Sequence, residues 1–245
     1  MRSYRRFLVL LAFATAIPAR AFARGPSEPP LFLGETLRYT MAIMGVNSGE
    51  LTLSARQTRL NGEPAYKFEM SAISNEFLSR IFLVRDYLAS WVDPESFRSL
   101  RFEAHTVEGK RARDNLIEFD YGEGIARRDG RPIAIADPTF DSLSSVYYIR
   151  TLNLDGGAPI LLDVVSQKRF SLRVEVQGRE TVATPAGVFR TIRVEPKSAG
   201  EGGLIGKGKN LILWVTDDEK KIPVQLRSKL KVGTLVGKLK SIERK

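Results

Sequence analysis

The sequence predicts a mainly β fold in which one strongly curled antiparallel sheet forms an open barrel or half-barrel around one or two short helices. Apolar and polar residues alternate with a period of two in most segments from Glu35 to Leu239, and short turns rich in Gly, Asn and Asp join them. A single clear helical pattern interrupts the series near its middle. Many antiparallel strands leave edges that must be closed or covered, so a curl around the helix is the economical arrangement. A two-sheet β-sandwich is the alternative.

The first strands are expected to form a meander. Apolar residues alternate with polar ones from Glu35 to Ile43, and again in the segments 51–55 and 66–72. Asn61 and Gly62 lie between the second and third segments and favour a two-residue turn, because both tolerate the positive φ angles of a type I′ turn. Three strands joined in this way should pair in chain order.

The alternation stops at Asn75–Phe82, where the pattern predicts a short helix with Asn75 as its N-cap. Strands are predicted again at 87–91, 100–104 and 117–121. The segment Gly130–Pro138 is expected to be a loop.

The segment Asp141–Leu152 is the clearest helix of the chain. Asp141 is a favourable N-cap, and apolar residues follow at spacings of three and four. Arg150 lies near the other end, where a cation interacts favourably with the helix dipole. The apolar stripe of this helix requires a sheet to pack against.

Strands resume after the helix. They are predicted at 160–165, 170–176 and 188–194, with a turn at Thr184–Gly187 and a mobile, glycine-rich loop at Ser198–Lys209.

The segment 210–239 predicts three more antiparallel strands. An apolar run ends at Asp217 and Asp218, and alternation restarts at Ile222. Gly233 then turns the chain again. One face of this unit is expected to be buried and the other exposed.

The N-terminus is typical of an export signal. Residues 1–23 contain a basic start, an apolar stretch at 7–17 and small residues before a cleavage site. That stretch is too short to span a membrane. We therefore expect a cleaved signal peptide at 1–23, a flexible lead at 24–33 and a single β-rich domain at 34–245. The processed protein should be periplasmic and carry no integral membrane segment.

Composition limits the class of function further. The chain has no cysteine, so neither a disulfide nor a lipoprotein anchor is expected. Residues 1–23 hold four arginines and no acidic residue, and their removal lowers the formal net charge from +10 to +6. This charge suits contact with anionic lipid or glycan. Nucleic acid is not expected as a partner, because the chain has neither a basic helix nor a basic-aromatic strand motif.

No catalytic constellation is visible in the sequence. His105 is the only histidine and is expected on the surface of a strand. The chain lacks a G-x-S-x-G nucleophile motif, and 206–209 lacks the spacing of a P-loop. Asp217 and Asp218 are too few ligands for calcium. We therefore expect no enzyme activity, no cofactor and no metal.

Two groups of residues are candidates for binding. Aromatic side chains would line a ligand space between helix and sheet, or would instead pack the core: Tyr39, Phe68, Trp91, Tyr147, Tyr148 and Trp214. Basic side chains over the last strands would face an anionic surface, or would instead form a solvated face that discourages edge pairing: Lys207, Lys209, Lys229, Lys231, Lys238 and Lys240.

Several motifs occur in a characteristic order. They are Gly34-Glu35-x-Leu37-x-Tyr39, Gly49, Asp141-x-Leu143-Ser144-x-x-Tyr147-x-x-Arg150, Thr184-Pro185-x-Gly187-x-Phe189, and Trp214-x-x-Asp217 followed by Ile222-Pro223-Val224. Together they resemble the exported bacterial family known as domain of unknown function 3108, over about Gly34 to Leu239. The resemblance implies a predominantly β periplasmic protein without an established activity, and it supplies no catalytic residue.

These observations leave two main hypotheses. The first is a non-enzymatic periplasmic binding protein whose curled sheet holds an amphiphile, such as a lipid, or a hydrophobic envelope component. The second is a structural or adaptor module that contacts another envelope protein through an exposed edge or the basic patch. An interior filled by the protein's own side chains would count against the first. A third hypothesis, an envelope hydrolase, lacks a nucleophile and base pair.

Overall fold

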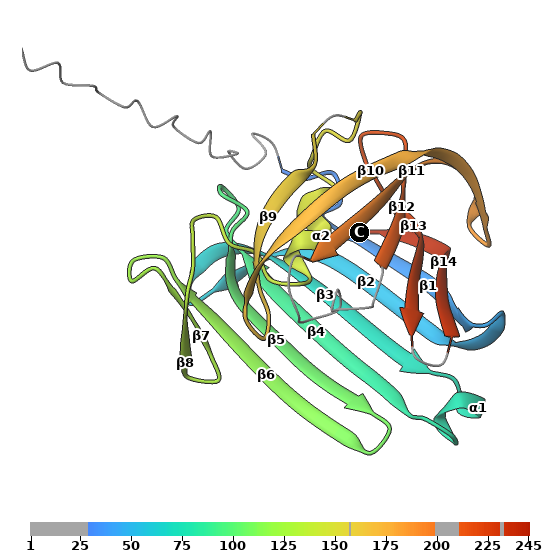
Figure 1. Ribbon diagram of the computed structural model, residues 1–245, viewed down its shortest axis with the longest axis horizontal. Helices are drawn as coiled ribbons and strands as arrows, with labels where there is room; N and C mark the ends of the chain where they lie inside the picture. The colour runs from blue at the N-terminus through green and yellow to red at the C-terminus, as the bar shows by residue number, and fades with distance from the viewer. Residues whose placement is uncertain (1–28, 157, 199–210, 231–232) are drawn as a thin grey trace, which may run out of the picture.

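The computed structural model describes residues 29–156, 158–198, 211–230 and 233–245. Its 14 strands form one antiparallel sheet that curls around the helix α2 (Figure 1). The sheet is not closed by strand pairing, because β8 and β9 remain as its two edges. The predicted curled sheet with two short helices is therefore confirmed, and the sandwich alternative is not the one formed.

The elements before α2 include eight strands and a one-turn helix: β1 (Glu35–Ile43), β2 (Val46–Leu60), β3 (Glu63–Ser74), α1 (Glu76–Ser79), β4 (Val84–Val92), β5 (Ser99–Glu108), β6 (Arg111–Asp120), β7 (Ile125–Arg128) and β8 (Arg131–Ala134). The elements from α2 onward are α2 (Ser144–Ile149), β9 (Ile160–Val165), β10 (Arg169–Thr184), β11 (Gly187–Ser198), β12 (Leu211–Thr216), β13 (Pro223–Leu230) and β14 (Gly233–Arg244).

The first and last strands meet in the middle of the sheet. β1 pairs with β2 on one side and with β14 on the other, and the strand order is β8-β7-β6-β5-β4-β3-β2-β1-β14-β13-β12-β11-β10-β9. The two edge strands are consequently neighbours in sequence. The connection between them carries α2 into the interior of the curl.

A short segment of that connection bridges the gap between the two halves. The Thr139 carbonyl accepts the backbone N–H of Ser99, at the start of β5, at 3.0 Å. Phe140 forms an isolated parallel bridge with Val164 of β9. Extended backbone at 139–140 thus joins the β5 side of the sheet to β9 and holds the curl around the helix.

Aromatic rings pack α2 against the inner face of the sheet. The Tyr147 ring stacks on Phe68 of β3, with centroids 4.1 Å apart, and the Tyr148 ring stacks on Phe140 at 4.4 Å. Phe97 contacts both Phe68 and Tyr148, at 5.6 Å in each case. The helix therefore packs inside the curl, against apolar side chains of the inner face of the sheet.

Asp141 binds the turn that leads into α2 from a fully buried position. Its Oδ1 accepts the backbone N–H groups of Leu143 and Ser144, at 2.8 and 2.9 Å, and its Oδ2 accepts the hydroxyls of Ser90 and Ser99, at 2.5 and 2.7 Å. Burial raises the pKa of this carboxyl, although these hydrogen bonds oppose the rise. Asp141 thus binds the start of the helix, but the predicted N-cap position is wrong: the N-cap of α2 is Leu143, and the helix begins later and ends earlier than expected.

Arg150 does not act as a simple surface cation at the helix end. Its guanidinium is buried and forms an ion pair with the buried carboxylate of Glu35 on β1. It also donates to the Lys220 carbonyl at 3.1 Å and lies 4.7 Å from the centre of the Phe32 ring. The sequence gives no direct sign of this pair, because its two residues are 115 positions apart. The pair connects α2 to β1.

Two other segments differ from the sequence-based expectation. Part of the predicted loop at 130–138 is strand β8, which pairs with β7 across a turn where Asp129 and Gly130 both have positive φ. Asp-Gly is a strong turn signal in a hairpin. Packing also begins before Gly34, because Phe32 is buried at 3% exposure among core aromatic residues. Most of the loop predicted at 198–209 lies outside the described residues.

We predict that breaking the Glu35–Arg150 pair from one side destabilises the protein strongly. Arg150→Met leaves a buried carboxylate without its cation, which costs about 3–5 kcal/mol of unfolding free energy. Urea unfolding followed by circular dichroism measures this loss. The double variant Glu35→Leu with Arg150→Met should recover most of it, because both charges are then gone. Arg38 lies on β1, like Glu35, and forms an exposed pair with Glu243 of β14. Arg38→Met breaks that pair and should leave the midpoint of urea unfolding nearly unchanged.

Candidate functional site on the outer face

Four of the six aromatic residues predicted to line a ligand space are part of the packed core. Tyr39, Phe68, Tyr147 and Tyr148 are all buried, and the Tyr39 hydroxyl donates to the Pro223 carbonyl at 2.6 Å. Phe68 and Tyr147 are in direct stacking contact. Among the described residues, these four side chains are therefore part of the packing between α2 and the sheet, as the packing alternative expects.

Trp91 lies on the opposite face of the sheet from Phe68. Ser90 and Val92 of the same strand are fully buried, so the intervening Trp91 points outward. Its ring has the Lys67 ammonium at 4.7 Å and the Arg101 guanidinium at 5.9 Å from its centroid. Trp91 thus belongs to the outer surface and not to the interior.

Trp214 is buried in a different environment. Its Nε1–H donates to Glu180 Oε1 at 2.7 Å, and the guanidinium groups of Arg193 and Arg227 lie 5.7 and 5.2 Å from its ring centroid. These contacts are typical of a tryptophan that holds neighbouring strands together. The six predicted residues therefore do not surround one common space.

Half of the predicted basic patch lies outside the described residues, namely Lys207, Lys209 and Lys231. Lys229, Lys238 and Lys240 are exposed on β13 and β14. Lys238 donates to the Ala183 carbonyl at 3.1 Å, and Lys240 pairs with Glu50 at 2.8 Å. Two of the three described lysines thus have structural partners, which fits the solvated-face alternative as well as a patch.

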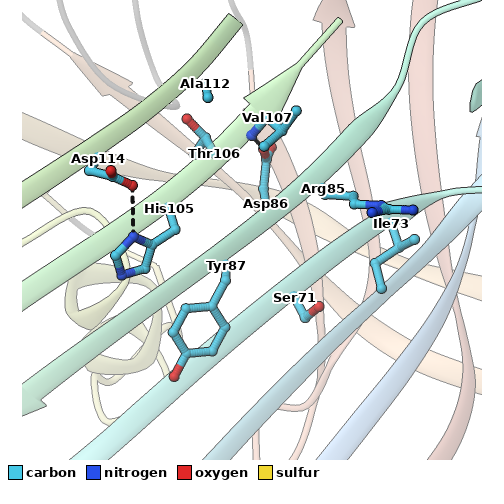
Figure 2. A pocket seen from close by; sticks show the side chains of 10 residues that line it. All are labelled: Ser71, Ile73, Arg85, Asp86, Tyr87, His105, Thr106, Val107, Ala112 and Asp114. Atoms are coloured by element: carbon cyan, nitrogen blue, oxygen red, sulfur yellow. Dashed lines mark hydrogen bonds and ion pairs between the residues drawn. The ribbon is translucent and has the colours of Figure 1, made fainter. Parts of the chain in front are cut away.

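A hollow of about 270 Å³ opens on the outer face of strands β3 to β6 (Figure 2). Two rows of side chains that lie opposite one another across neighbouring strands supply most of its lining. The first row is Ser71, Tyr87, His105 and Asp114, and the second is Ile73, Arg85, Val107 and Ala112; Asp86 and Thr106 complete it. The strand register therefore builds this site.

The polar groups of the hollow are held in place by direct contacts. His105 Nδ1 and Asp114 Oδ1 are 2.8 Å apart across the β5–β6 hairpin, as Figure 2 shows, and the Tyr87 ring lies nearly parallel to the His105 ring with centroids 6.3 Å apart. The Tyr87 hydroxyl donates to Glu69 Oε1 at 2.6 Å, and Lys67 donates to the same oxygen at 2.7 Å. These bonds fix the ring orientation.

The carboxyl groups near the hollow have shifted pKa values. Partial burial favours the neutral form of Glu69, but hydrogen bonds from Lys67, Tyr87 and Arg56 outweigh it and lower the pKa to about 2. Asp86 behaves in the opposite way, because burial and the nearby charge of Glu108 raise its pKa to about 6. Beside the hollow, Glu69 is therefore firmly ionised at neutral pH, whereas Asp86 in its lining titrates below neutrality.

The arrangement does not form a hydrolytic triad. Ser71, His105 and Asp114 lie in one row, but Tyr87 separates Ser71 from His105. Two strand spacings amount to about 10 Å, whereas a nucleophile and its base must approach to about 3 Å. Among the described residues, no group of three or more possible metal-ligating side chains is found. The hollow offers aromatic, cationic and hydrogen-bonding surface, which suits binding.

Sequence reasoning missed most of this site, although one signal was present. Gly109 and Lys110 form a two-residue loop between β5 and β6, and such a loop fixes the register of the hairpin. That register places His105 directly opposite Asp114. The part played by Tyr87 and Arg85 depends on pairing between β3, β4 and β5, which the sequence does not specify.

The fold defines a β-barrel-like class of protein. A crystal structure of a beta-barrel-like protein of domain of unknown function DUF1849 from Brucella abortus matches with a TM-score of 0.63 and 8% sequence identity, covering 89% of this chain and 100% of that one. The hypothetical protein CT021 from Chlamydia trachomatis matches with a TM-score of 0.37 and 10% identity, covering 85% of this chain and 86% of that one. The match to the protein from Brucella abortus supports the assignment of the fold.

The family is shown by the sequence itself. The family model described as protein of unknown function (DUF3108) matches residues 38–240, and the chain belongs to that family. No curated protein matches the chain. Within the part of the chain that the structure describes, no helix is long and apolar enough to cross a membrane.

We predict that Asp86→Asn makes the protein more stable at neutral pH. The folded-state pKa of Asp86, about 6, lies above the unfolded value of about 3.9. The unfolded state therefore loses its proton first, and stability falls as the pH rises from about 4 to about 6. The variant avoids this loss and keeps an oxygen that can accept the Val107 N–H.

The test is urea unfolding of both proteins at a series of pH values. The variant should exceed the wild type in unfolding free energy above pH 6, and this advantage should shrink progressively below pH 6. An advantage that does not change with pH would contradict the assignment of this titration to Asp86.

Proposed function

We propose that this protein is a non-enzymatic module of the bacterial cell envelope that binds another envelope protein through the outer face of strands β3 to β6. The observation that carries the proposal is the contrast between the two faces of the sheet. On the inner face, buried aromatic rings of α2 pack against the sheet, whereas the outer face contains the hollow lined by Tyr87, His105 and Arg85. A partner therefore has access to the outer face without any change in the fold.

Export supports the location in the envelope. Residues 1–23 have the composition of a cleavable signal peptide, and the lack of cysteine disfavours a lipid anchor. In this proposal the processed protein acts in the periplasm. The resemblance of the sequence motifs to an exported bacterial family supports the same location.

The outer face has the composition of a protein-binding surface. Trp91 and Tyr87 present aromatic rings there, and Lys67, Arg101 and Arg85 lie around them. Aromatic residues and arginine are enriched where interfaces derive most of their binding energy. The ion pair and hydrogen bonds that hold Tyr87 and Lys67 also reduce the entropy that these side chains would lose on binding.

An amphiphile held inside the curl is less well supported by the packing. Such a ligand would have to replace the contacts of Tyr147 with Phe68 and of Tyr148 with Phe97. The helix would also have to leave Asp141 and the Glu35–Arg150 pair, whose charges are buried. These contacts of the described residues therefore favour the adaptor hypothesis over the carrier hypothesis.

We predict that a photo-crosslinking amino acid in place of His105 captures one dominant protein in the periplasm of the native host. The same probe in place of Arg59, which is exposed at the far end of β2, should not. Arg85→Glu combined with the probe at position 105 should reduce the adduct at least fivefold, because it reverses a charge that lines the hollow. Arg59→Glu is the matched control and should leave the yield unchanged.

Solvent extraction of the purified protein followed by mass spectrometry tests the carrier alternative. The proposal expects no lipid in fixed proportion to protein. A stoichiometric lipid, together with equal adduct yields at positions 59 and 105, would contradict it.

A further inference from the structure

One end of the sheet carries an unusual concentration of exposed apolar side chains. Six of the ten large apolar residues that are exposed in the described parts of the chain lie there, each between 47% and 75% exposed. We call this set the apolar rim: Met44, Val46, Ile73, Phe77, Ile81 and Phe82. The helix α1 contributes to it without burying any of its own residues. Core packing therefore does not account for these side chains.

Hydrogen bonds hold the parts of the apolar rim next to one another. The Asn75 side chain donates to the Asn47 carbonyl at 2.7 Å and its backbone N–H to the Ser48 carbonyl at 2.9 Å, which joins the start of α1 to β2. The Met44 N–H donates to the Thr234 carbonyl of β14 at 3.0 Å. The rim thus runs continuously along adjacent turns, at the lower right end of the molecule in Figure 1.

On its other side, the rim reaches the β5–β6 turn. A Cβ atom added to Gly109 would lie 2.8 Å from the Phe82 ring, so this ring packs directly over the backbone of that turn. Gly109 also has a positive φ of 62°. The glycine lets the turn and Phe82 come together, and it places the basic residues that follow beside the rim.

The opposite end of the sheet has a different chemistry. Its turns contain the exposed polar segments Asn61–Glu63, Gly122–Glu123 and Asp218–Lys220. An antiparallel meander sends alternate turns to opposite ends. The contrast between the rim and these polar turns therefore involves several turns at each end and does not come from one loop.

Cations surround the apolar rim. The basic residues of the nearby turns and strand ends exceed the acidic ones by two. Exposed Arg80, Arg85, Lys110, Arg111, Arg113 and Lys229 stand against exposed Glu76, Glu108 and Asp114 and half-buried Asp86. Two of these acids are already paired, Glu76 with Arg80 at 2.5 Å and Asp114 with His105 at 2.8 Å. The exposed cations Lys110, Arg111 and Arg113 of the β5–β6 hairpin have no bond of this kind among the described residues.

We propose that the apolar rim inserts into the interfacial region of a lipid bilayer that contains anionic phospholipid, with the neighbouring cations over the headgroups. In this region apolar groups enter the acyl boundary and cations contact anionic headgroups. Apolar turns flanked by lysine and arginine are suited to both contacts. Binding to a second copy through the same surface would place identical cations opposite one another, which is unfavourable.

This inference gives the adaptor a fixed orientation and rests on the envelope location in the proposed function. Ile73 and Arg85 belong both to the end of the molecule that carries the rim and to the lining of the hollow. A protein bound at the hollow would accordingly be held at the membrane surface. Binding of the apolar rim to a bilayer needs no partner protein, so it can be measured with the purified protein and lipid vesicles.

The experiment measures flotation of the processed protein, recovered from the periplasm of an expressing host, with lipid vesicles. The protein should float with vesicles of phosphatidylcholine mixed with phosphatidylglycerol and much less with phosphatidylcholine alone. Phe77→Ser with Ile81→Ser should weaken binding about tenfold or more, because two apolar side chains no longer enter the bilayer. Leu161→Ser with Val188→Ser, which alters equally exposed residues elsewhere, should bind like the wild type.

Charge reversal tests the second part of the proposal. Arg111→Glu with Arg113→Glu should weaken binding to the anionic vesicles about tenfold, whereas Arg59→Glu should not change it. Circular dichroism should show unchanged strand content in all variants, since every altered residue is exposed.

Three results would overturn the inference: no flotation of the wild type with anionic vesicles, equal losses in the rim pair and the control pair, or concentration-dependent self-association abolished by the rim pair in place of vesicle binding. Vesicle binding that survives while crosslinking at position 105 fails would reject only the proposed adaptor function. The reverse pattern would reject only this membrane contact.

Discussion

The contact between the Tyr147 ring and the Phe68 ring, 4.1 Å apart and nearly parallel, joins the central helix to the inner face of the sheet. A sheet that curls this strongly must fill its concave side, because an empty apolar interior forfeits the contacts that stabilise a core. The six residues of α2 meet that need with two tyrosine rings and Ile149, all buried. The rest of the architecture follows from bringing this short helix to the centre.

The chain topology places the helix there in a simple way. Because β1 and β14 pair in the middle of the sheet, its free edges are β8 and β9, which are consecutive in sequence. The connection between them must cross the open side of the curl, and it carries α2 inward as it does so. Thr139 and Phe140 then bond to both halves, so the same segment covers the gap and holds the helix.

Buried polar groups determine where the helix lies. Apolar packing tolerates small shifts of a helix along a sheet, whereas a buried carboxylate must keep its donors. Asp141 receives hydrogen bonds from Ser90 and Ser99 of two strands, and Arg150 at the other end pairs with Glu35 on β1. The helix is thus held at both ends by bonds that would be lost on displacement. The hollow and the apolar rim lie outside this fixed contact between helix and sheet.

The sequence by itself determined most of the strands, several turns and the pattern of a signal peptide, since these depend on neighbours in the chain. Alternation predicted most strands, Asn61-Gly62 predicted its turn, and Asp141 marked the start of the central helix. Only the tertiary structure decided which face each aromatic residue occupies relative to the helix: Phe68 packs inside, whereas Trp91 lies outside. It also decided the Glu35–Arg150 pair, the hollow and the apolar rim. Each of these joins residues from strands or turns far apart in sequence, and the pairing that brings them together leaves no periodic pattern in the chain.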